Sequence, residues 1–127
     1  MRLLLDTHAL LWWVADDPRL PSRADALLTD DAAEVFVSAV SAWEIAIKAR
    51  SGKLEAGPLA QGFAAEIARQ GFLPLPISLE HAERAGQLPA VHRDPFDRML
   101  VAQAQAENLH LLSNERIFDR YGVVRVW

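Results

Sequence analysis

The chain opens with MRLLLDTHALLWWVA, residues 1–15, and this stretch decides the class of fold. Its first residues form a short apolar run that ends at Asp6, which predicts a buried strand. Residues 8–15 then predict a helix that closes near Pro18. A strand followed directly by a helix is typical of parallel sheets, because parallel neighbours need a crossover connection.

The alternation of strand and helix continues along the rest of the chain. Further strands are predicted at residues 34–37, 72–77, 109–112 and 123–126. Helices are predicted at residues 22–29, 44–49 and 59–69, from Ser78, and from Asp94 to Glu107. Two prolines weaken the 72–77 strand, which is therefore expected at an edge of the sheet. We expect an α/β fold in three α/β/α layers, with a mostly parallel, twisted sheet of four to five strands.

Composition limits the class of protein. The 127 residues, of which 51% are hydrophobic, suit a single domain over residues 1–127. No cysteine is present, which excludes disulfides and thiolate zinc sites and fits an intracellular protein. The leucines at residues 3–5 are too few for a signal peptide, and no apolar run approaches the roughly 20 residues that span a bilayer. We therefore expect a cytoplasmic protein without a membrane segment.

The net charge of −4 argues against broad attraction to nucleic acid, which normally depends on Lys and Arg side chains at the phosphates. This objection weakens where the acids surround a bound cation, because the ion reverses the local charge and can meet a phosphate itself. The positions of the acids therefore matter more than their sum.

Four acids fall where the predicted strands end. Asp6 follows the first strand, and Glu44 lies in the helix entered from the second. Asp97 lies in the first turn of its helix, and Glu115 follows the strand 109–112. In a parallel sheet these positions share one edge, where ligands of such folds bind.

Asp6 and Glu44 each have a simpler explanation. Asp6 could cap the first helix, although Thr7 is an equally good cap. Glu44 stands three residues after Ser41, which matches a capping box, and four residues before Lys48, which matches a helix-stabilising ion pair. Taken singly, neither acid requires a catalytic role.

Asp97 is harder to explain by capping alone. Asp94 as the N-cap, with Asp97 in the first turn, is what the helix macrodipole favours. Asp97 also falls inside the apolar face that Leu100 and Val101 help to define, and a carboxylate on such a face needs a partner. Glu115, taken alone, is typical of a surface residue.

Capping does not explain why all these acids gather at one edge. Two carboxylates about 5 Å apart repel by roughly 3 kcal/mol at an effective dielectric near 20, so either cations intervene or some acids are protonated. The two lysines, Lys48 and Lys53, are not at strand ends, so a counter-ion from the protein is expected to be Arg93 or Arg98. A site made only of oxygen ligands suits Mg²⁺ or Mn²⁺ and not zinc.

Several segments together resemble a known family. These segments are Leu4-Leu5-Asp6-Thr7-His8, SAVSAWEI at residues 38–45, HRDPFDRML at residues 92–100, and Leu111-Leu112-Ser113-Asn114-Glu115 with Phe118 and Tyr121-Gly122. In order and spacing they resemble the PIN-domain toxins of the VapC type. The resemblance covers nearly the whole chain, and HRDPFDR is its most specific part.

The resemblance implies a PIN-like fold, Mg²⁺- or Mn²⁺-dependent cleavage of RNA, neutralisation by a cognate antitoxin, and a homodimer. It places the first three family carboxylates on Asp6, Glu44 and Asp97, with Asp94 in a supporting position. The fourth, usually an aspartate in a Thr-x-Asp pattern, falls on Glu115. The longer side chain of glutamate moves this carboxylate and can require a bridging water.

We expect hydrolysis of an RNA phosphodiester by a metal-activated water. Asp6 and Asp97 would bind the ion directly, and Glu44 would bind it or orient the water. Ser113, in the place of the family's threonine, could fix a water or a phosphate oxygen. Further candidates for support or substrate contact are Thr7, His92, Arg93, Arg98 and the group Lys48, Arg50 and Lys53.

Trp12 and Trp13 bear on the partners of the chain. Their side chains point about 100° apart on a helix, so both can be buried only if a second element or a partner covers one side. Ordinary core packing and a homodimer contact both remain open.

Two other classes of protein stay open. One is a PIN-like protein that binds RNA or an antitoxin with weak or no cleavage, which the departure at Glu115 favours. The other is a phosphate-handling α/β domain, either a receiver or a phosphatase. The phosphatase pattern expects an aspartate at the position of His8, and a receiver expects a lysine at a late strand end, so this chain lacks both features.

Overall fold

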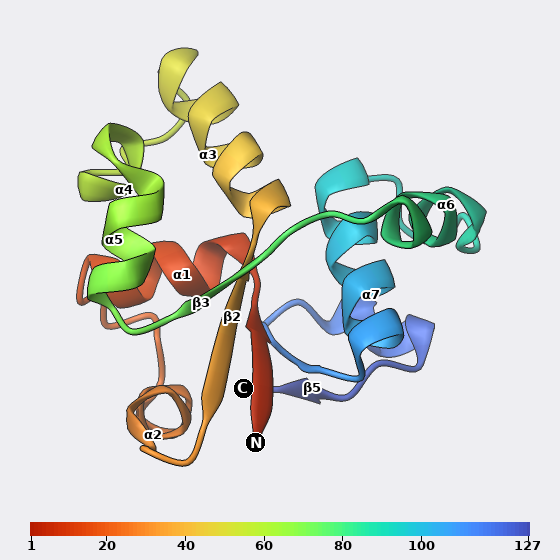
Figure 1. Ribbon diagram of the computed structural model, residues 1–127, viewed down its shortest axis with the longest axis horizontal. Coiled ribbons are helices and arrows are strands. Elements are labelled where there is room, and N and C mark those ends of the chain that lie inside the picture. The colour runs from red at the N-terminus through yellow and green to blue at the C-terminus, as the bar shows by residue number, and fades with distance from the viewer.

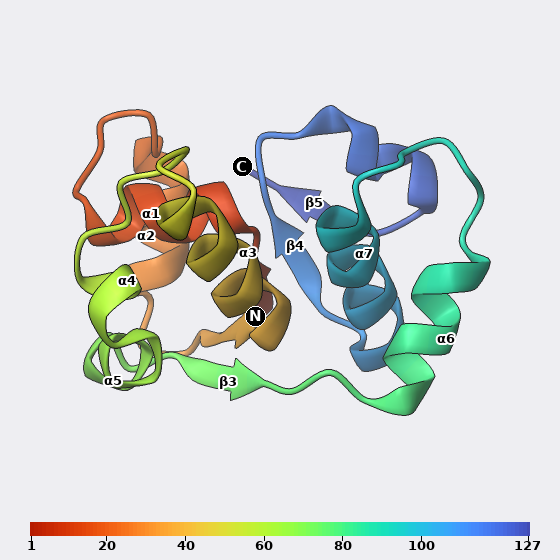
Figure 2. The ribbon, with the colours of Figure 1, turned by 90° about the horizontal axis from the view of Figure 1, so that it is seen from above.

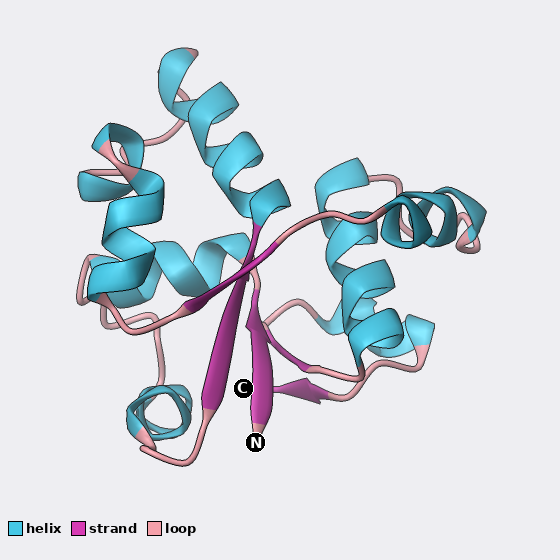
Figure 3. Cartoon of the chain, viewed as in Figure 1, coloured by secondary structure: helices cyan, strands magenta, loops and turns pink.

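The computed structural model describes residues 1–127 and contains one five-stranded sheet (Figures 1 and 3). The strands are β1 (Arg2–Leu5), β2 (Glu34–Ser38), β3 (Leu73–Leu75), β4 (His110–Leu112) and β5 (Arg125–Val126). All neighbours in the order β3-β2-β1-β4-β5 are parallel. The predicted α/β class is confirmed, and the sheet is parallel throughout.

Helices connect every pair of consecutive strands. They are α1 (Thr7–Val14), α2 (Ser22–Thr29), α3 (Ala39–Arg50), α4 (Pro58–Gln61), α5 (Phe63–Arg69), α6 (Leu79–Gln87), α7 (Pro95–Glu107) and the 3-10 helix η1 (Arg116–Tyr121). None of them combines the length and the apolar character that crossing a bilayer requires.

The central strand is buried on both faces, as its continuous leucine run predicts. Leu3 and Leu5 pack into a core formed with α1 to α5, whereas Leu4 packs into a second core that includes Leu100 of α7 and Phe118 of η1. Figure 2 shows α1 to α5 on one side of the sheet and α6 and α7 on the other. The predicted three-layer arrangement is confirmed.

Several predicted elements differ from the structure in their bounds, among them the last strand, which is reduced from 123–126 to Arg125–Val126. The helix expected at residues 59–69 is divided into α4 and α5 by Gly62, whose ψ of 74° is not helical. The strand expected at 72–77 is reduced to Leu73–Leu75, and it lies at the edge of the sheet as its prolines predicted.

The chain reverses direction across the sheet beside β1. It runs from β1 outward to β2 and β3, and then returns through α6 and α7 to β4 on the other side of β1. The ends of β1 and β4 are joined by a 3.1 Å hydrogen bond from the Asp6 N–H to the Leu112 carbonyl. In open parallel sheets a ligand binds at such a switch point, beyond the carboxyl ends of the strands.

Candidate metal centre

Asp6 stands directly after β1 and caps α1 at the same time. Its Oδ1 accepts a hydrogen bond from the Ala9 N–H at 2.7 Å, so the predicted capping role is confirmed. Asp6 is only 3% exposed, and this burial is the main cause that raises its pKa to about 6. The Ser113 hydroxyl lowers this pKa, and the charge of Asp97 raises it. A cation beside Asp6 would therefore stabilise an ionised form that the protein alone disfavours.

Glu44 projects from α3 and is also buried, with 4% exposed. Its Oε1 accepts a hydrogen bond from Thr7 Oγ1 at 2.7 Å, and its Oε2 accepts one from Lys48 Nζ at 2.5 Å. The predicted ion pair with Lys48 is therefore confirmed. Thr7 also shares a 3.0 Å hydrogen bond with Ser41 Oγ, so polar contacts tie the first turn of α1 to α3.

The capping box predicted for Ser41 and Glu44 is wrong. The N-cap of α3 is Ser38, whose Oγ accepts a hydrogen bond from the Val40 N–H at 3.0 Å. Ser41 lies inside the first turn and is fully buried. The helix begins earlier than the Ser-x-x-Glu pattern suggested, because the last residue of β2 is itself a capping residue.

Asp97 faces Glu44 from α7. Asp94 caps that helix as predicted, since its Oδ1 accepts hydrogen bonds from the N–H groups of Phe96 and Asp97. Burial is the main cause that raises the pKa of Asp97, and the charges of Asp94 and Glu44 raise it further. The charge of Glu44 on α3 is therefore close enough to oppose the ionisation of Asp97 on α7.

His92 has a role that the sequence did not reveal. Its Nε2 lies 2.7 Å from Asp97 Oδ2, and this contact lowers the pKa of Asp97. The ring packs edge-on against Phe118, and the His92 N–H donates to Tyr121 Oη at 3.0 Å. These contacts make His92 a positioning residue for Asp97. The only signal in the sequence was its place five residues earlier in the same segment.

The counter-ion supplied by the protein is Lys48, and the expected arginine is a wrong prediction. The hydrogen bond to Glu44 is the main cause that raises the pKa of Lys48, and the charges of Asp94 and Asp97 add to it. Lys48 is far from any strand end in the sequence. However, α3 begins where β2 ends, so a side chain one turn beyond Glu44 still reaches the acids.

Arg98 was predicted as a counter-ion or substrate contact, but its guanidinium hydrogen-bonds to the backbone instead. Its guanidinium donates to four carbonyl oxygens, those of Ala85, Leu88, Pro89 and His92, at 2.8 to 3.1 Å. Arg98 therefore holds the segment between α6 and α7 in place. Arg93, in contrast, is exposed.

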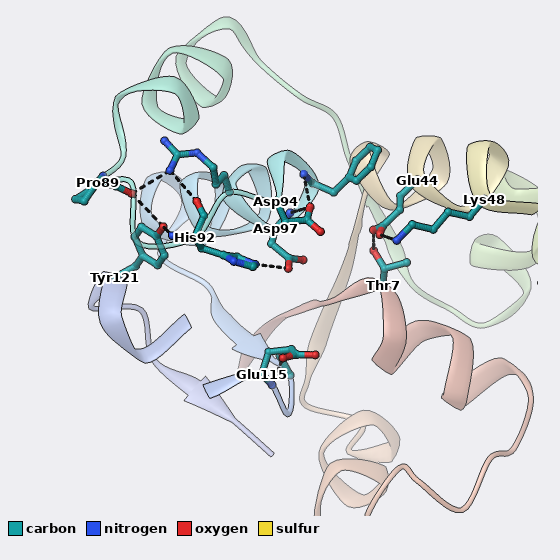
Figure 4. A network of polar contacts seen from close by, with 12 residues as sticks. Thr7, Glu44, Lys48, Pro89, His92, Asp94, Asp97, Glu115 and Tyr121 are labelled. Carbon is teal, nitrogen blue, oxygen red and sulfur yellow. Dashed lines mark hydrogen bonds and ion pairs between the residues drawn. The ribbon is translucent and has the colours of Figure 1, made fainter. Parts of the chain in front are cut away.

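Glu115 lies on the loop after β4, at the predicted edge of the sheet, but its side chain is exposed. Its N–H donates to Ser113 Oγ at 2.9 Å, and Ser113 is fully buried. Figure 4 shows Glu115 apart from Asp94 and Asp97. Glu115 is therefore connected to the other acids only through Ser113, whose hydroxyl lowers the pKa of Asp6.

In this structure no three Asp, Glu or His side chains lie close enough together to hold one ion. Two of the acids are instead paired with protein cations or donors, Glu44 with Lys48 and Asp97 with His92 (Figure 4). The donor set nevertheless fits Mg²⁺ or Mn²⁺, because these ions prefer carboxylate oxygens. Burial also makes a nearby positive charge favourable at Asp6 and Asp97.

The fold and these acids define an α/β domain with an oxygen-donor site at the carboxyl edge of a parallel sheet. The family model of the PIN domain matches residues 3–124, and the chain belongs to this family. The predicted resemblance is confirmed, and the receiver and phosphatase alternatives are set aside. No curated protein sequence matches the chain.

Solved structures share the fold over almost the whole chain. One is VapBC2 from Rickettsia felis bound to a DNA fragment from its promoter, with a TM-score of 0.73, 16% identity, and coverage of 99% of this chain and 98% of that one. DNA-bound VapBC from Salmonella typhimurium has a TM-score of 0.71 and 18% identity, covering 99% and 97%. FitAcB from Neisseria gonorrhoeae has a TM-score of 0.64 and 18% identity, covering 98% and 96%.

Proposed function

We propose that this chain is a metal-dependent endoribonuclease and the toxin of a toxin–antitoxin pair. The observation that carries the proposal is the set of three carboxylates at the switch point of a PIN-domain sheet, with Asp6 and Glu44 buried and Asp97 partly buried. PIN domains are generally nucleases, which supports hydrolysis of a phosphodiester. The ionised forms of such acids are unfavourable without a nearby cation, and with one they can serve as metal ligands.

Each acid has a distinct task in this proposal. Asp6 and Asp97 would hold Mg²⁺ or Mn²⁺, and Glu44 would bind the ion or orient the attacking water. When bound, the ion lowers the pKa of a water and stabilises charge on the phosphate. Asp94 adds negative charge beside Asp97, and Glu115 would reach the centre through a bridging water.

The surrounding side chains would position these groups. His92 fixes one oxygen of Asp97, and Thr7 fixes one oxygen of Glu44. Ser113 would hold a water or a phosphate oxygen next to Asp6. Arg93 is exposed, so we retain it as a contact for the RNA backbone, which would be met in the cytoplasm.

We also propose two protein partners. Complexes named VapBC and FitAcB are among the proteins that share the fold, which supports a cognate antitoxin for this chain. For the homodimer, Trp12 packs on Trp127 and Trp13 on Phe72 within the chain, and both side chains stay partly exposed. The side chains of Trp43 and Ile47 on α3 are further candidates for the dimer contact, because they are 60% and 44% exposed.

A second candidate is a PIN protein that binds RNA or its antitoxin with little or no cleavage. Two observations favour it: both oxygens of Glu44 already accept hydrogen bonds, from Thr7 and Lys48, and Glu115 is exposed where the family usually has an aspartate. This candidate predicts binding of RNA without metal-dependent products.

Digestion of an end-labelled RNA separates the two candidates. The proposed nuclease gives products with Mn²⁺ and none with excess chelator, and Asp6→Asn lowers the rate at least about 100-fold, a typical loss for a group that stabilises the transition state. Asp25→Asn, which removes an exposed acid of α2, serves as the matched control and retains the activity. Cleavage that persists undiminished in Asp6→Asn would overturn the proposed function.

A further inference from the structure

We propose that Lys48 is a resident counter-ion of the acidic site: its ammonium group neutralises Glu44 in the metal-free protein and competes with a divalent cation for that carboxylate. The inference rests on the proposed metal-dependent function. It concerns one contact of this chain, the 2.5 Å hydrogen bond between Lys48 Nζ and Glu44 Oε2.

Both oxygens of Glu44 already accept a hydrogen bond in this structure. Oε2 accepts from Lys48, and Oε1 accepts from Thr7 Oγ1 at 2.7 Å. The Glu44 side chain is only 5% exposed, so water cannot replace either partner freely. An ion that uses Glu44 would share this carboxylate with both partners. Lys48 carries a positive charge that repels the ion, whereas Thr7 is neutral and is fixed by burial and by Ser41.

Lys48 is the partner that can leave. Its side chain is 36% exposed, and it consists of a flexible four-carbon stem that carries a compact charge. It also faces more than one acid, because the charges of Asp94 and Asp97 act on it together with that of Glu44. The ammonium group thus contacts one carboxylate and lies in the electrostatic field of two more, a field that would also attract a divalent ion.

This pair differs from an ordinary helical ion pair in the same chain. Arg84 and Glu80 on α6 have the same spacing of four residues, but they lie 3.6 Å apart with 42% and 68% of their side chains exposed. Such exposed pairs contribute little and are screened by salt. Removal of Lys48 would instead leave a buried carboxylate without its cation, which makes that carboxylate a stronger ligand for a metal.

The test is titration of the full-length protein with Mn²⁺ alone, followed by electron paramagnetic resonance. We expect Lys48→Met to bind Mn²⁺ at least about tenfold more tightly than the wild type, since a charge a few ångströms from the ion is removed. Arg84→Met is the matched control, because it removes a cation from an exposed pair, and its affinity is expected to be unchanged. Melting curves in chelator establish that each variant is folded.

A second measurement does not depend on the Lys48→Met variant. The chain contains only two lysines, Lys48 and Lys53, so the ammonium ¹⁵N signals can be assigned by comparison with Lys53→Met. Saturating Mg²⁺ should shift the Lys48 signal and leave the Lys53 signal in place. This result supports the proposal even if Lys48→Met does not fold.

The outcomes distinguish this inference from the function on which it rests. If the wild type binds Mn²⁺ but Lys48→Met binds it equally or more weakly, or if Mg²⁺ leaves the Lys48 signal unmoved, competition by Lys48 is overturned and the nuclease proposal stands. If the wild type binds no Mn²⁺ and its RNA cleavage does not depend on metal, both proposals fail.

Discussion

At the scale of single residues, the candidate centre combines structural and chemical roles in the same side chains. Asp6 caps α1 and is also the most strongly perturbed acid of the site. Asp94 caps α7 and adds negative charge beside Asp97. A capping explanation for these residues was therefore correct without being complete, because capping uses one carboxylate oxygen and leaves the second for other partners.

The perturbed pKa of Asp6 predicts a stability that depends on pH. Because this pKa is raised from 3.8 to about 6, the folded protein binds the proton more tightly than the unfolded chain does. The contribution of Asp6 to stability in chelator should thus be largest below about pH 4 and should be lost as the pH rises through about 6. The difference between the two pKa values corresponds to a change of up to about 3 kcal/mol in the free energy of unfolding.

Asp6→Asn tests this prediction through chemical denaturation between pH 4 and pH 7. Asparagine can still cap α1, so the variant should be more stable than the wild type at pH 7 by roughly 1 to 3 kcal/mol, with little difference at pH 4. A variant that is less stable than the wild type at pH 7 would show that Asp6 is not strained by its burial. Asp25→Asn again serves as the control.

At the scale of secondary-structure elements, the sequence predicted what local patterns determine. The leucines of β1 predicted a buried strand, and the prolines of β3 predicted an edge strand. The division of one helix at Gly62 and the start of α3 at Ala39 were missed. The last residue of β2, Ser38, also serves as the N-cap of α3. The pattern therefore offered two possible caps, Ser38 and Ser41, and only the sheet register selects one.

Ser38 is therefore expected to matter more than a typical cap. Its Oγ accepts from the Val40 N–H and donates to the buried Gln103 Oε1. Ser38→Ala should lower the free energy of unfolding by about 2 kcal/mol, from a lost cap and an unsatisfied buried acceptor. Ser22→Ala, at an exposed position of α2 without a capping bond, should change it by less than about 0.5 kcal/mol in the same urea titrations. Equal effects of the two changes would contradict this account.

At the scale of the whole molecule, the parallel topology gathers acids that are far apart in the sequence. The site residues were predicted from the ends of strands, and the structure places Asp6, Glu44 and Asp97 at one edge of the sheet. The ion pair of Glu44 with Lys48 was predicted from their spacing, but the contact of His92 with Asp97 and the approach of Lys48 to the acids of α7 were not, because they depend on how α3 and α7 face each other across the sheet. For the same reason the sequence could not show that Trp12 packs on Trp127 and Trp13 on Phe72.

The proposed homodimer gives a prediction at this scale. Trp43 is 60% exposed on α3, and a charged side chain there should oppose burial at an interface. Trp43→Glu is expected to shift the molecule from dimer to monomer in sedimentation equilibrium. Leu79→Glu, at an 89% exposed position of α6, should leave the mass unchanged. A dimer that survives Trp43→Glu would place the interface elsewhere.

The central claim is that the buried acids bind a divalent ion, and diffraction from crystals soaked in Mn²⁺ tests it most directly. We predict an anomalous peak between Asp6 and Asp97, about 2.2 Å from an oxygen of each. Another group of acids, Asp16, Asp17 and Asp25, lines a separate hollow of about 570 Å³ beside Trp12 and Trp13, and provides an internal comparison. A peak there, with none between Asp6 and Asp97 at saturating Mn²⁺, would contradict the account.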